Sequence, residues 1–131
     1  MKKIIPNINF KNCKEALDYY KEIFGGEIKN LQKSDNTPGF EGQEGKIIHV
    51  ELHINDQCIL YLVDAMGDSA ESGNMDLILE LDSEEEINKL YKALSKDGTI
   101  KFELQKTFWG AQHAIITDCF GVTWGLNYML Q

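Results

Sequence analysis

The order of hydrophobic patterns along the chain constrains its fold more than any other feature. Helices are predicted over residues 12–26 and 83–98, because apolar residues recur there every three or four positions between a capping side chain and a glycine. Each helix follows one strand-like segment and precedes three more. These segments are 3–10, 27–32, 46–54 and 58–64 around the first helix, and 76–82, 100–105, 112–118 and 122–128 around the second. The order βαβββ therefore occurs twice, although no residue-level repeat accompanies it.

Capping side chains mark the starts of both predicted helices. Asn12 precedes the first, and a Ser83–Glu86 capping box opens the second, with each side chain bonded to a free N–H group of the first turn. We therefore expect an α+β fold built from two βαβββ modules, at about residues 1–66 and 75–131. A length of 131 residues is ordinary for one domain, so both modules are expected to belong to a single domain spanning 1–131.

Strand alternation separates an apolar face from a polar face in each module. We expect the helices to cover the apolar face, which comprises Ile4, Ile8, Phe10, Ile48, Val50, Leu52, Ile54, Leu60, Leu62, Leu77, Leu79, Leu81, Phe102, Leu104, Val122, Trp124 and Leu126. The polar face comprises Asn7, Asn9, His49, Glu51, His53, Tyr61, Asp76, Glu80, Glu103, Thr123 and Asn127. This polar face either lies in water, as in many helix-covered sheets, or lines a shared cleft if two sheets curve together.

The charge balance argues against one class of partner. Thirteen Lys and Arg residues against 21 Asp and Glu give a net charge of -8, whereas a nucleic-acid surface needs clustered basic residues. No apolar run approaches the ~20 residues of a membrane span, and residues 1–10 lack the apolar stretch of a signal peptide. We therefore expect a cytoplasmic protein. Cys13, Cys58 and Cys119 match no zinc-site spacing and are expected to be reduced structural thiols.

Four segments together carry a resemblance to a known family. They are the first helix with its glycines (13–28), "HVEL" (49–52), "QKTFWG" (105–110) and "DCFGVTWGLNY" (118–128). With the paired βαβββ order, they make the chain similar to the PhnB-like branch of the vicinal oxygen chelate superfamily, which includes glyoxalases, bleomycin-resistance proteins and dioxygenases. The resemblance implies that the two modules form a cup-shaped mixed sheet and that the protein is a homodimer.

The resemblance also implies the positions of a metal site. Metal-dependent members place His or Glu on the first and last strands of each module, because a divalent ion needs several convergent N or O donors. The corresponding positions here are near Ile5, Tyr61, Asp76 and Gly125. Asp76 alone offers a suitable ligand as it stands, so we expect no metal at the usual site and no other cofactor. Gly125 is expected to leave space that a ligand or a neighbouring side chain fills.

His49, Glu51 and His53 form a possible substitute site, because they alternate along one predicted strand and point the same way. Alternate positions lie about 6.6 Å apart, so two of these side chains can converge on one ion, but three in a row span too far without distortion. The His49–Glu51 pair is also suited to act as base and orienting group in proton transfer. The structural interpretation is that His53 is exposed and that the other two bond to neighbours on the sheet.

Trp109 and His113 are the corresponding candidates in the second module. Trp109 follows Phe108, and it either stacks on a planar ligand or caps the core or a dimer contact. His113 either enters the cleft or is an ordinary half-buried side chain. With the polar-face residues they give the expected ligand-binding set: Asn7, His49, Glu51, Tyr61, Asp76, Glu80, Glu103, Trp109 and His113.

These observations predict a protein that binds a small molecule in the cup without the usual metal site, and they leave open whether it is an enzyme. The alternative is a metal-dependent isomerase, lyase or dioxygenase, with His49, Glu51 and Asp76 or Glu80 rearranged into a new site. A dimeric module that binds a partner through its acidic surface is neither supported nor excluded. Some PhnB-like proteins are labelled methyltransferases, but no glycine-rich nucleotide loop follows a strand here.

Overall fold

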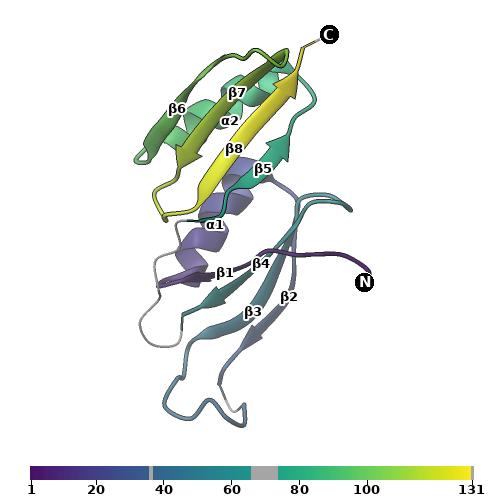
Figure 1. Ribbon diagram of the computed structural model, residues 1–131. Coiled ribbons are helices and arrows are strands. Elements are labelled where there is room, and N and C mark those ends of the chain that lie inside the picture. The colour runs from purple at the N-terminus through teal and green to yellow at the C-terminus, as the bar shows by residue number, and fades with distance from the viewer. Residues whose placement is uncertain (36, 66–73, 131) are drawn as a thin grey trace. The chain divides into compact units, whose positions relative to one another are not determined.

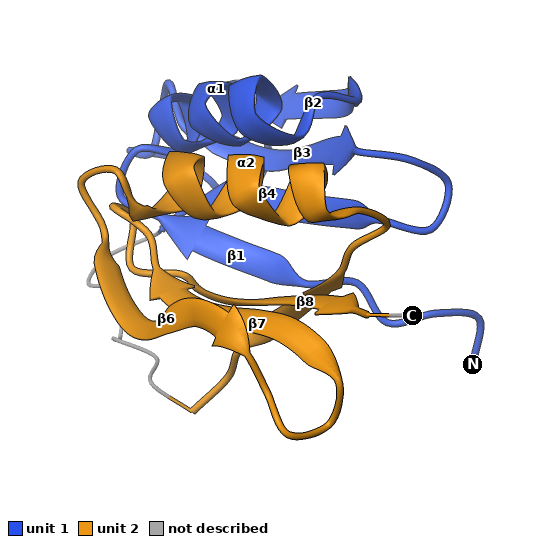
Figure 2. Cartoon of the chain, turned by 90° about the horizontal axis from the view of Figure 1, so that it is seen from above, with its two compact units in different colours: residues 1–71 blue, residues 72–131 orange. Residues whose placement is uncertain are grey.

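A computed structural model of the chain describes residues 1–35, 37–65 and 74–130. Within these residues the chain forms two helices and eight strands, in the order β1 α1 β2 β3 β4 followed by β5 α2 β6 β7 β8 (Figure 1). The chain divides into two compact units, residues 1–71 and 72–131, each with one helix and one four-stranded mixed sheet (Figure 2). The predicted α+β fold and the doubled βαβββ order are confirmed.

The first unit is a mixed sheet covered by one helix. Its elements are β1 (Asn7–Phe10), α1 (Cys13–Phe24), β2 (Glu27–Lys33), β3 (Ile47–His53) and β4 (Ile59–Asp64). The strands lie in the order β1-β4-β3-β2, with β1 parallel to β4 and the other pairs antiparallel. Helix α1 packs against β1, β3 and β4. The apolar core comprises Phe10, Cys13, Ala16, Leu17, Tyr20, Ile47, Val50, Leu52, Leu60 and Leu62.

The second unit repeats this topology. Its elements are β5 (Leu77–Glu80), α2 (Glu84–Ser95), β6 (Thr99–Lys106), β7 (Ala111–Thr117) and β8 (Thr123–Met129). The strand order β5-β8-β7-β6 matches that of the first unit position by position, again with the first strand parallel to the last. Helix α2 packs against β6, β7 and β8. The apolar core comprises Ile87, Leu90, Leu94, Ala111, Ala114, Ile116, Trp124 and Leu126.

The predicted helix caps are present, with one difference. Asn12 Oδ1 accepts the N–H of Glu15 at 3.1 Å, and Ser83 Oγ accepts the N–H of Glu86 at 3.1 Å. The Glu86 carboxylate, however, accepts the N–H of Asp82 at 2.9 Å instead of the N–H of Ser83. The reciprocal bond of the predicted capping box therefore goes to the preceding residue.

Three apolar residues lie outside the positions predicted for them. Ile4 is exposed, because β1 begins at Asn7 and Pro6 has no N–H group to extend the ladder. In β3 a register shift leaves Ile48 half-buried. In β6 two register shifts flank Phe102, whose ring contacts His113 at a centroid distance of 5.9 Å. Phe102 therefore lies on the face expected to be polar.

Two buried aspartates tie segments of each unit together. Asp64, at the end of β4, accepts the N–H groups of Cys13 at 2.8 Å and Ile47 at 2.7 Å. Asp118 accepts two N–H groups of the following turn through Oδ1, and it accepts the indole N–H of Trp124 through Oδ2 at 2.8 Å. The Asp and Trp of "DCFGVTWGLNY" are thus partners in one hydrogen bond, which gives this segment a structural role.

The cysteines differ in their surroundings. Cys13 is buried in the first unit, and burial, followed by the nearby Asp64 carboxylate, raises the pKa of its thiol to about 12. Cys58 and Cys119 are exposed, so of the three expected structural thiols only Cys13 lies in a core.

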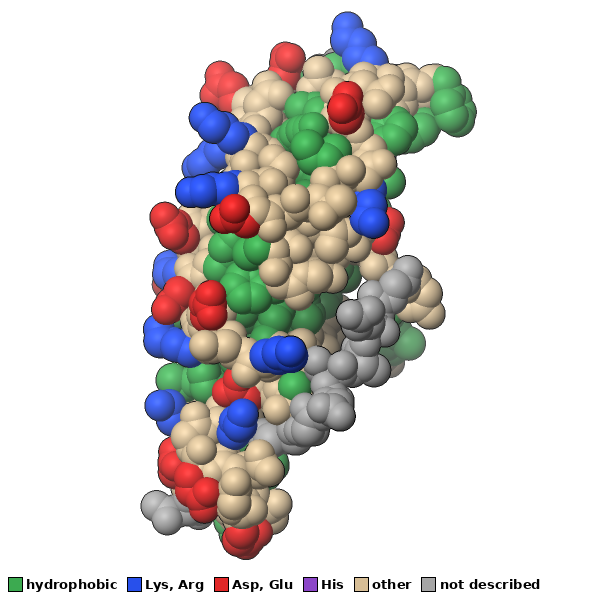
Figure 3. Space-filling model, turned by 90° about the vertical axis from the view of Figure 1, so that its left-hand side faces the viewer, with side chains coloured by type: hydrophobic (Ala, Val, Ile, Leu, Met, Phe, Trp, Pro, Cys, Tyr) green, Lys and Arg blue, Asp and Glu red, His purple; other side chains and the backbone are tan. Residues whose placement is uncertain are grey.

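The surface of the molecule shows no separation of charge in the view of Figure 3, where acidic and basic side chains are interspersed. In the part of the chain that the structure describes, neither helix is long and apolar enough to cross a membrane.

Candidate functional site

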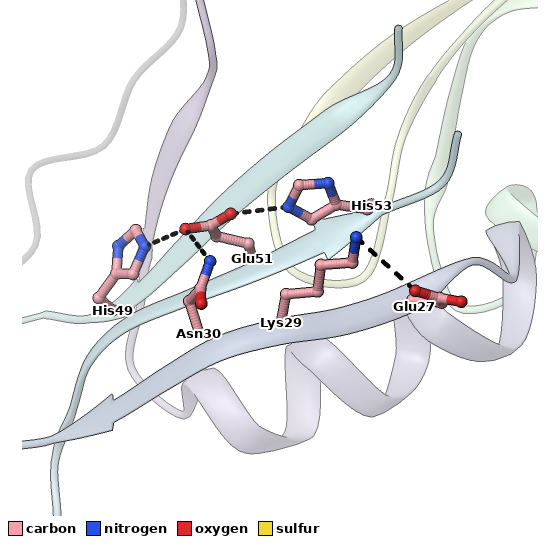
Figure 4. Close-up of polar contacts among 6 residues, drawn as sticks. All are labelled: Glu27, Lys29, Asn30, His49, Glu51 and His53. Atoms are coloured by element: carbon pink, nitrogen blue, oxygen red, sulfur yellow. Dashed lines mark hydrogen bonds and ion pairs between the residues drawn. The ribbon is translucent and has the colours of Figure 1, made fainter. Parts of the chain in front are cut away.

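A carboxylate held between two imidazoles is the main polar feature of the first unit. His49 Nε2 lies 2.7 Å from Glu51 Oε2, and His53 Nε2 lies 2.7 Å from Glu51 Oε1 (Figure 4). All three residues belong to β3 and point away from α1, because they alternate with Val50 and Leu52 of the core. Alternation thus predicted their shared face. The structure shows that the outer two side chains converge on the middle one.

Asn30 completes this cluster from the neighbouring strand. Its Nδ2 donates to Glu51 Oε2 at 3.1 Å. Asn30 has φ = 57° and lies at a register shift of the β2–β3 pair, between Lys29 and Gln32. Such a bulge redirects a side chain, and Asn tolerates positive φ better than most residues. Sequence reasoning missed Asn30, because alternation assumes a regular strand; an Asn inside the strand pattern was the available signal.

The Glu51 carboxylate is stabilised in its ionised form. The residue is 8% exposed, and its two oxygens accept from three side chains. Hydrogen bonds from His49 and then His53 lower the pKa of Glu51 to about 2, with a smaller contribution from Asn30, although burial acts in the opposite direction. Glu51 is therefore a fixed acceptor at neutral pH.

The residues around this cluster come from all four strands of the sheet. The Tyr61 ring meets the His49 ring edge-on at a centroid distance of 4.8 Å. In strand register, Asn7 pairs with Tyr61, Tyr61 with Glu51, and Glu51 with Lys29, so these four residues form one row across the sheet. Asn7 is exposed at the β1 edge. At the β2 edge, Lys29 Nζ lies 3.7 Å from the Glu27 carboxylate (Figure 4).

The second unit has its own polar cluster, centred on Asn127 of β8. Asn127 Nδ2 donates to both oxygens of Glu80, at 3.3 and 3.2 Å. Its Oδ1 lies 3.2 Å from His113 Nδ1 and accepts a long bond of 3.5 Å from Trp109 Nε1. Glu80, Asn127 and His113 lie on the β5, β8 and β7 strands at matching register, which explains why they meet. The structure thus joins three of the predicted residues, Glu80, Trp109 and His113.

Asn127 is the residue of this cluster that the predicted ligand-binding set omitted. It is buried, and its amide orients the other members. The signal was its place on the predicted polar face. Trp109 is 43% exposed and meets the His113 ring edge-on at a centroid distance of 5.4 Å, so it does not cap a core within its unit.

Two predicted site residues lie apart from these clusters. Asp76 is exposed just before β5, and Glu103 is exposed in β6 within the register shift between Phe102 and Gln105. Neither side chain makes a hydrogen bond or ion pair with another described residue. The register shifts in β6 explain why Glu103 lies apart from the cluster. They bring Phe102 to the sheet face that Glu103 was expected to occupy.

The positions implied for a metal site do not fit a divalent ion. In β1 the residue opposite Tyr61 is Asn7, not Ile5, and in β5 the residue opposite Gly125 is Ile78, not Asp76. Neither pair contains a carboxylate or an imidazole. Among residues 1–35, 37–65 and 74–130, no group of three or more His, Cys, Asp and Glu side chains is placed to hold an ion.

Comparisons with known proteins agree with the fold. The family model of the Glyoxalase/Bleomycin resistance protein/Dioxygenase superfamily matches residues 6–126. Protein YjdN of Escherichia coli (strain K12) is 31% identical, over 96% of this chain and 95% of that protein. The crystal structure of PA1353 from Pseudomonas aeruginosa has a TM-score of 0.86 at 28% identity, over 100% of both chains. The PhnB protein from Bacillus cereus, named a putative 3-demethylubiquinone-9 3-methyltransferase, has a TM-score of 0.80 at 26% identity, over 97% of this chain and 99% of that chain.

Proposed function

The chain belongs to the glyoxalase/bleomycin resistance protein/dioxygenase superfamily, and from this membership we propose that it binds a small molecule without a metal ion at the positions used by metal-dependent members. The observation that carries this proposal is the packing at Gly125. A Cβ atom there would lie 2.5 Å from Ile78 Cδ1, so the side chain of Ile78 fills the space that a metal-binding carboxylate would need.

The polar cluster of each unit supplies groups that would contact a ligand at the sheet face of that unit. In each unit they lie on the sheet face opposite the core, and internal hydrogen bonds hold them in place. The side chains of His49 and His53 are 29% and 23% exposed, and Trp109 adds an exposed aromatic surface in the second unit. A few positioned polar groups beside an aromatic ring are typical of small-molecule sites.

Three other expectations stay predictions from the sequence. They are the homodimer, the cytoplasmic location and the absence of a cofactor. We do not propose methyltransferase activity, the activity in the name of the Bacillus cereus relative, because no glycine-rich nucleotide loop follows a strand in this sequence.

Elemental analysis tests the metal-independent part of the proposal. The purified protein is incubated with zinc, nickel, manganese and iron in turn, desalted, and measured for retained ions. We expect no ion in stoichiometric amount. About one ion per chain would overturn the proposal and favour the metal-dependent isomerase, lyase or dioxygenase. Loss of that ion in His49→Ala would place it at the cluster of His49, Glu51 and His53.

A thermal-shift screen tests the binding part. A ligand that binds the folded state alone raises the melting temperature, and the shift grows with the logarithm of the ligand concentration once this exceeds the dissociation constant. We expect at least one compound of a small-molecule library to do so, with a reduced shift in His49→Ala or Trp109→Ala. Glu22→Gln, an exposed change on α1, is the control and should keep the shift. A diverse library without any stabilising compound counts against binding.

A further inference from the structure

The hydrogen bonds of Glu51 fix the positions of two protons. A carboxylate that stays ionised has no proton to donate, so each imidazole nitrogen that faces it must carry one. His49 and His53 both face Glu51 through Nε2, at 2.7 Å each. In its neutral form, each ring is therefore held with the proton on Nε2 and with a lone pair on Nδ1. The low pKa of Glu51, about 2, agrees with this assignment.

The Nδ1 atoms are the ring nitrogens of His49 and His53 that do not face Glu51. Neither makes a hydrogen bond with another described residue, and both side chains are partly exposed. The donor from Asn30 holds the carboxylate in place between the rings. When either Nδ1 takes up a proton, the imidazolium that results is paired with a carboxylate already in contact, which is the arrangement that makes a histidine an efficient base.

We propose that His49, Glu51 and His53 form a metal-independent general-base site that removes a proton from a polarised C–H or O–H group of a small ligand. This inference rests on the proposed function, because the ligand has to bind at the same sheet face. His53 and His49 are the catalytic residues, and Glu51 and Asn30 are positioning residues.

The proton-transfer step balances without an added oxidant, reductant or metal ion. Nδ1 takes the proton, and the electron pair of the broken C–H or O–H bond stays on the ligand as an anion or forms a new π bond as a leaving group departs. The imidazolium, held by Glu51, then returns its proton to the product or to water. The site is thereby restored.

The charged neighbours of the cluster largely offset one another. Lys29 and Glu27 of β2 lie on the same face and pair with each other at 3.7 Å (Figure 4). The Tyr61 ring of β4 meets the His49 ring edge-on, and Asn7 of β1 is uncharged. The carboxylate of Glu51 is thus the dominant charge next to both imidazoles.

The substitution Glu51→Gln tests whether the ionised carboxylate sets the tautomers of both rings. A glutamine amide accepts through one atom and donates through the other, so it can accept from one imidazole and must donate to the second. Asn30 donates on the His49 side, which places the amide oxygen there. His53 then faces an N–H donor, and its proton must move from Nε2 to Nδ1.

Nitrogen-15 NMR of the imidazole rings at neutral pH reads these tautomers directly. We expect the Nε2–H form for His49 and His53 in the native protein, and the Nδ1–H form for His53 alone in Glu51→Gln, with His113 as an internal reference in each spectrum. A native protein in which either His49 or His53 carries its proton on Nδ1 overturns the inference, as does an unchanged His53 in the variant.

The activity test uses 5-nitrobenzisoxazole, whose ring opens to a coloured phenolate once a base removes its C–H proton. In the presence of a metal chelator, the native protein should exceed an equal concentration of free imidazole. Glu51→Gln should lose about tenfold or more of the rate, and His53→Gln should lose the part of the rate that His53 contributes. Glu22→Gln, the matched change on exposed α1, should keep it.

The outcomes separate this inference from the proposed function. A rate no higher than that of imidazole, or equal rates in native protein, His53→Gln and Glu51→Gln, overturns the general-base site even if the thermal shift with a library compound persists. A stoichiometric retained ion together with a rate that the chelator abolishes overturns the proposed function as well. If circular dichroism shows that Glu51→Gln is unfolded, the inference is tested by the rate of His53→Gln and by the tautomers of His49 and His53 in the native protein.

Discussion

The side chain of Ile78 occupies the space beside Gly125 on the neighbouring strand. The two residues are directly opposite in the parallel β5–β8 pair, and Ile78 Cδ1 lies 2.5 Å from the position that a Cβ atom of residue 125 would take. Of the two occupants predicted for this space, a ligand or a neighbouring side chain, the neighbouring side chain is the one found. A metal-binding side chain at position 125 therefore requires Ile78 to move first.

This packing predicts that the effect of Gly125→Ala depends on residue 78. With Ile78 present the new methyl group forces a rotation of the isoleucine end, whereas Ile78→Val removes the Cδ1 atom that it would meet. In a double-mutant cycle followed by urea unfolding, we expect a favourable interaction of about 0.5–1.5 kcal/mol between the two changes. Additive effects would show that Ile78 does not fill this space.

Much of the fold could be predicted from sequence, because it depends on local patterns. Alternation, the Asn12 cap and the Ser83 cap predicted the element order and the two helices. The differences come from interactions that a regular pattern does not contain. Pro6 ends the β1 ladder, and the bulge in β6 brings Phe102 to the face of His113.

The candidate site was predictable to the extent that strands are regular. Alternation placed His49, Glu51 and His53 on one face, and their spacing raised the question of whether three such side chains can converge on an ion. The structure shows a different convergence, in which the middle carboxylate accepts from both outer rings. Asn30 joins its cluster through a bulge in β2, and Asn127 joins its cluster through pairing with His113 across strands. The alternation pattern of a single strand shows neither interaction.

Asp64→Asn should destabilise the first unit. The carboxylate accepts the N–H of Cys13 through one oxygen and the N–H of Ile47 through the other, whereas an amide would turn an N–H group toward one of these donors. We expect a loss of about 1–3 kcal/mol in the free energy of unfolding, measured with urea. Asp18→Asn is the matched control on the surface of α1, where the Lys14 pair is exposed and should contribute less than about 0.5 kcal/mol. Equal effects of the two changes would contradict the role of Asp64.

Trp124→Phe should destabilise the second unit more than Trp109→Phe. Trp124 is buried and donates its indole N–H to Asp118 at 2.8 Å, so phenylalanine removes a bond to a charged group and part of the core volume. We expect a loss of about 1.5–3 kcal/mol. Trp109 is exposed and its bond to Asn127 is 3.5 Å long, so its replacement should cost less than about 0.5 kcal/mol. Thermal unfolding of both variants measures the two losses of stability. A larger loss in Trp109→Phe than in Trp124→Phe would refute this prediction.

The low pKa of Glu51 predicts how stability depends on pH. In the folded state hydrogen bonds from His49, His53 and Asn30 lower this pKa to about 2 from an ordinary value of 4.5, so folding favours the ionised carboxylate. The stabilisation that results is fully present above about pH 4.5 and is lost as the pH falls toward 2. Glu51→Gln cannot titrate, so its stability should differ most from that of the native protein above pH 4.5 and converge on it in acid. Urea unfolding at a series of pH values measures this difference, with Glu22→Gln as the reference for removing one exposed carboxylate. A difference that stays constant from neutral pH down to about pH 2 would show that Glu51 is not held ionised by the two imidazoles.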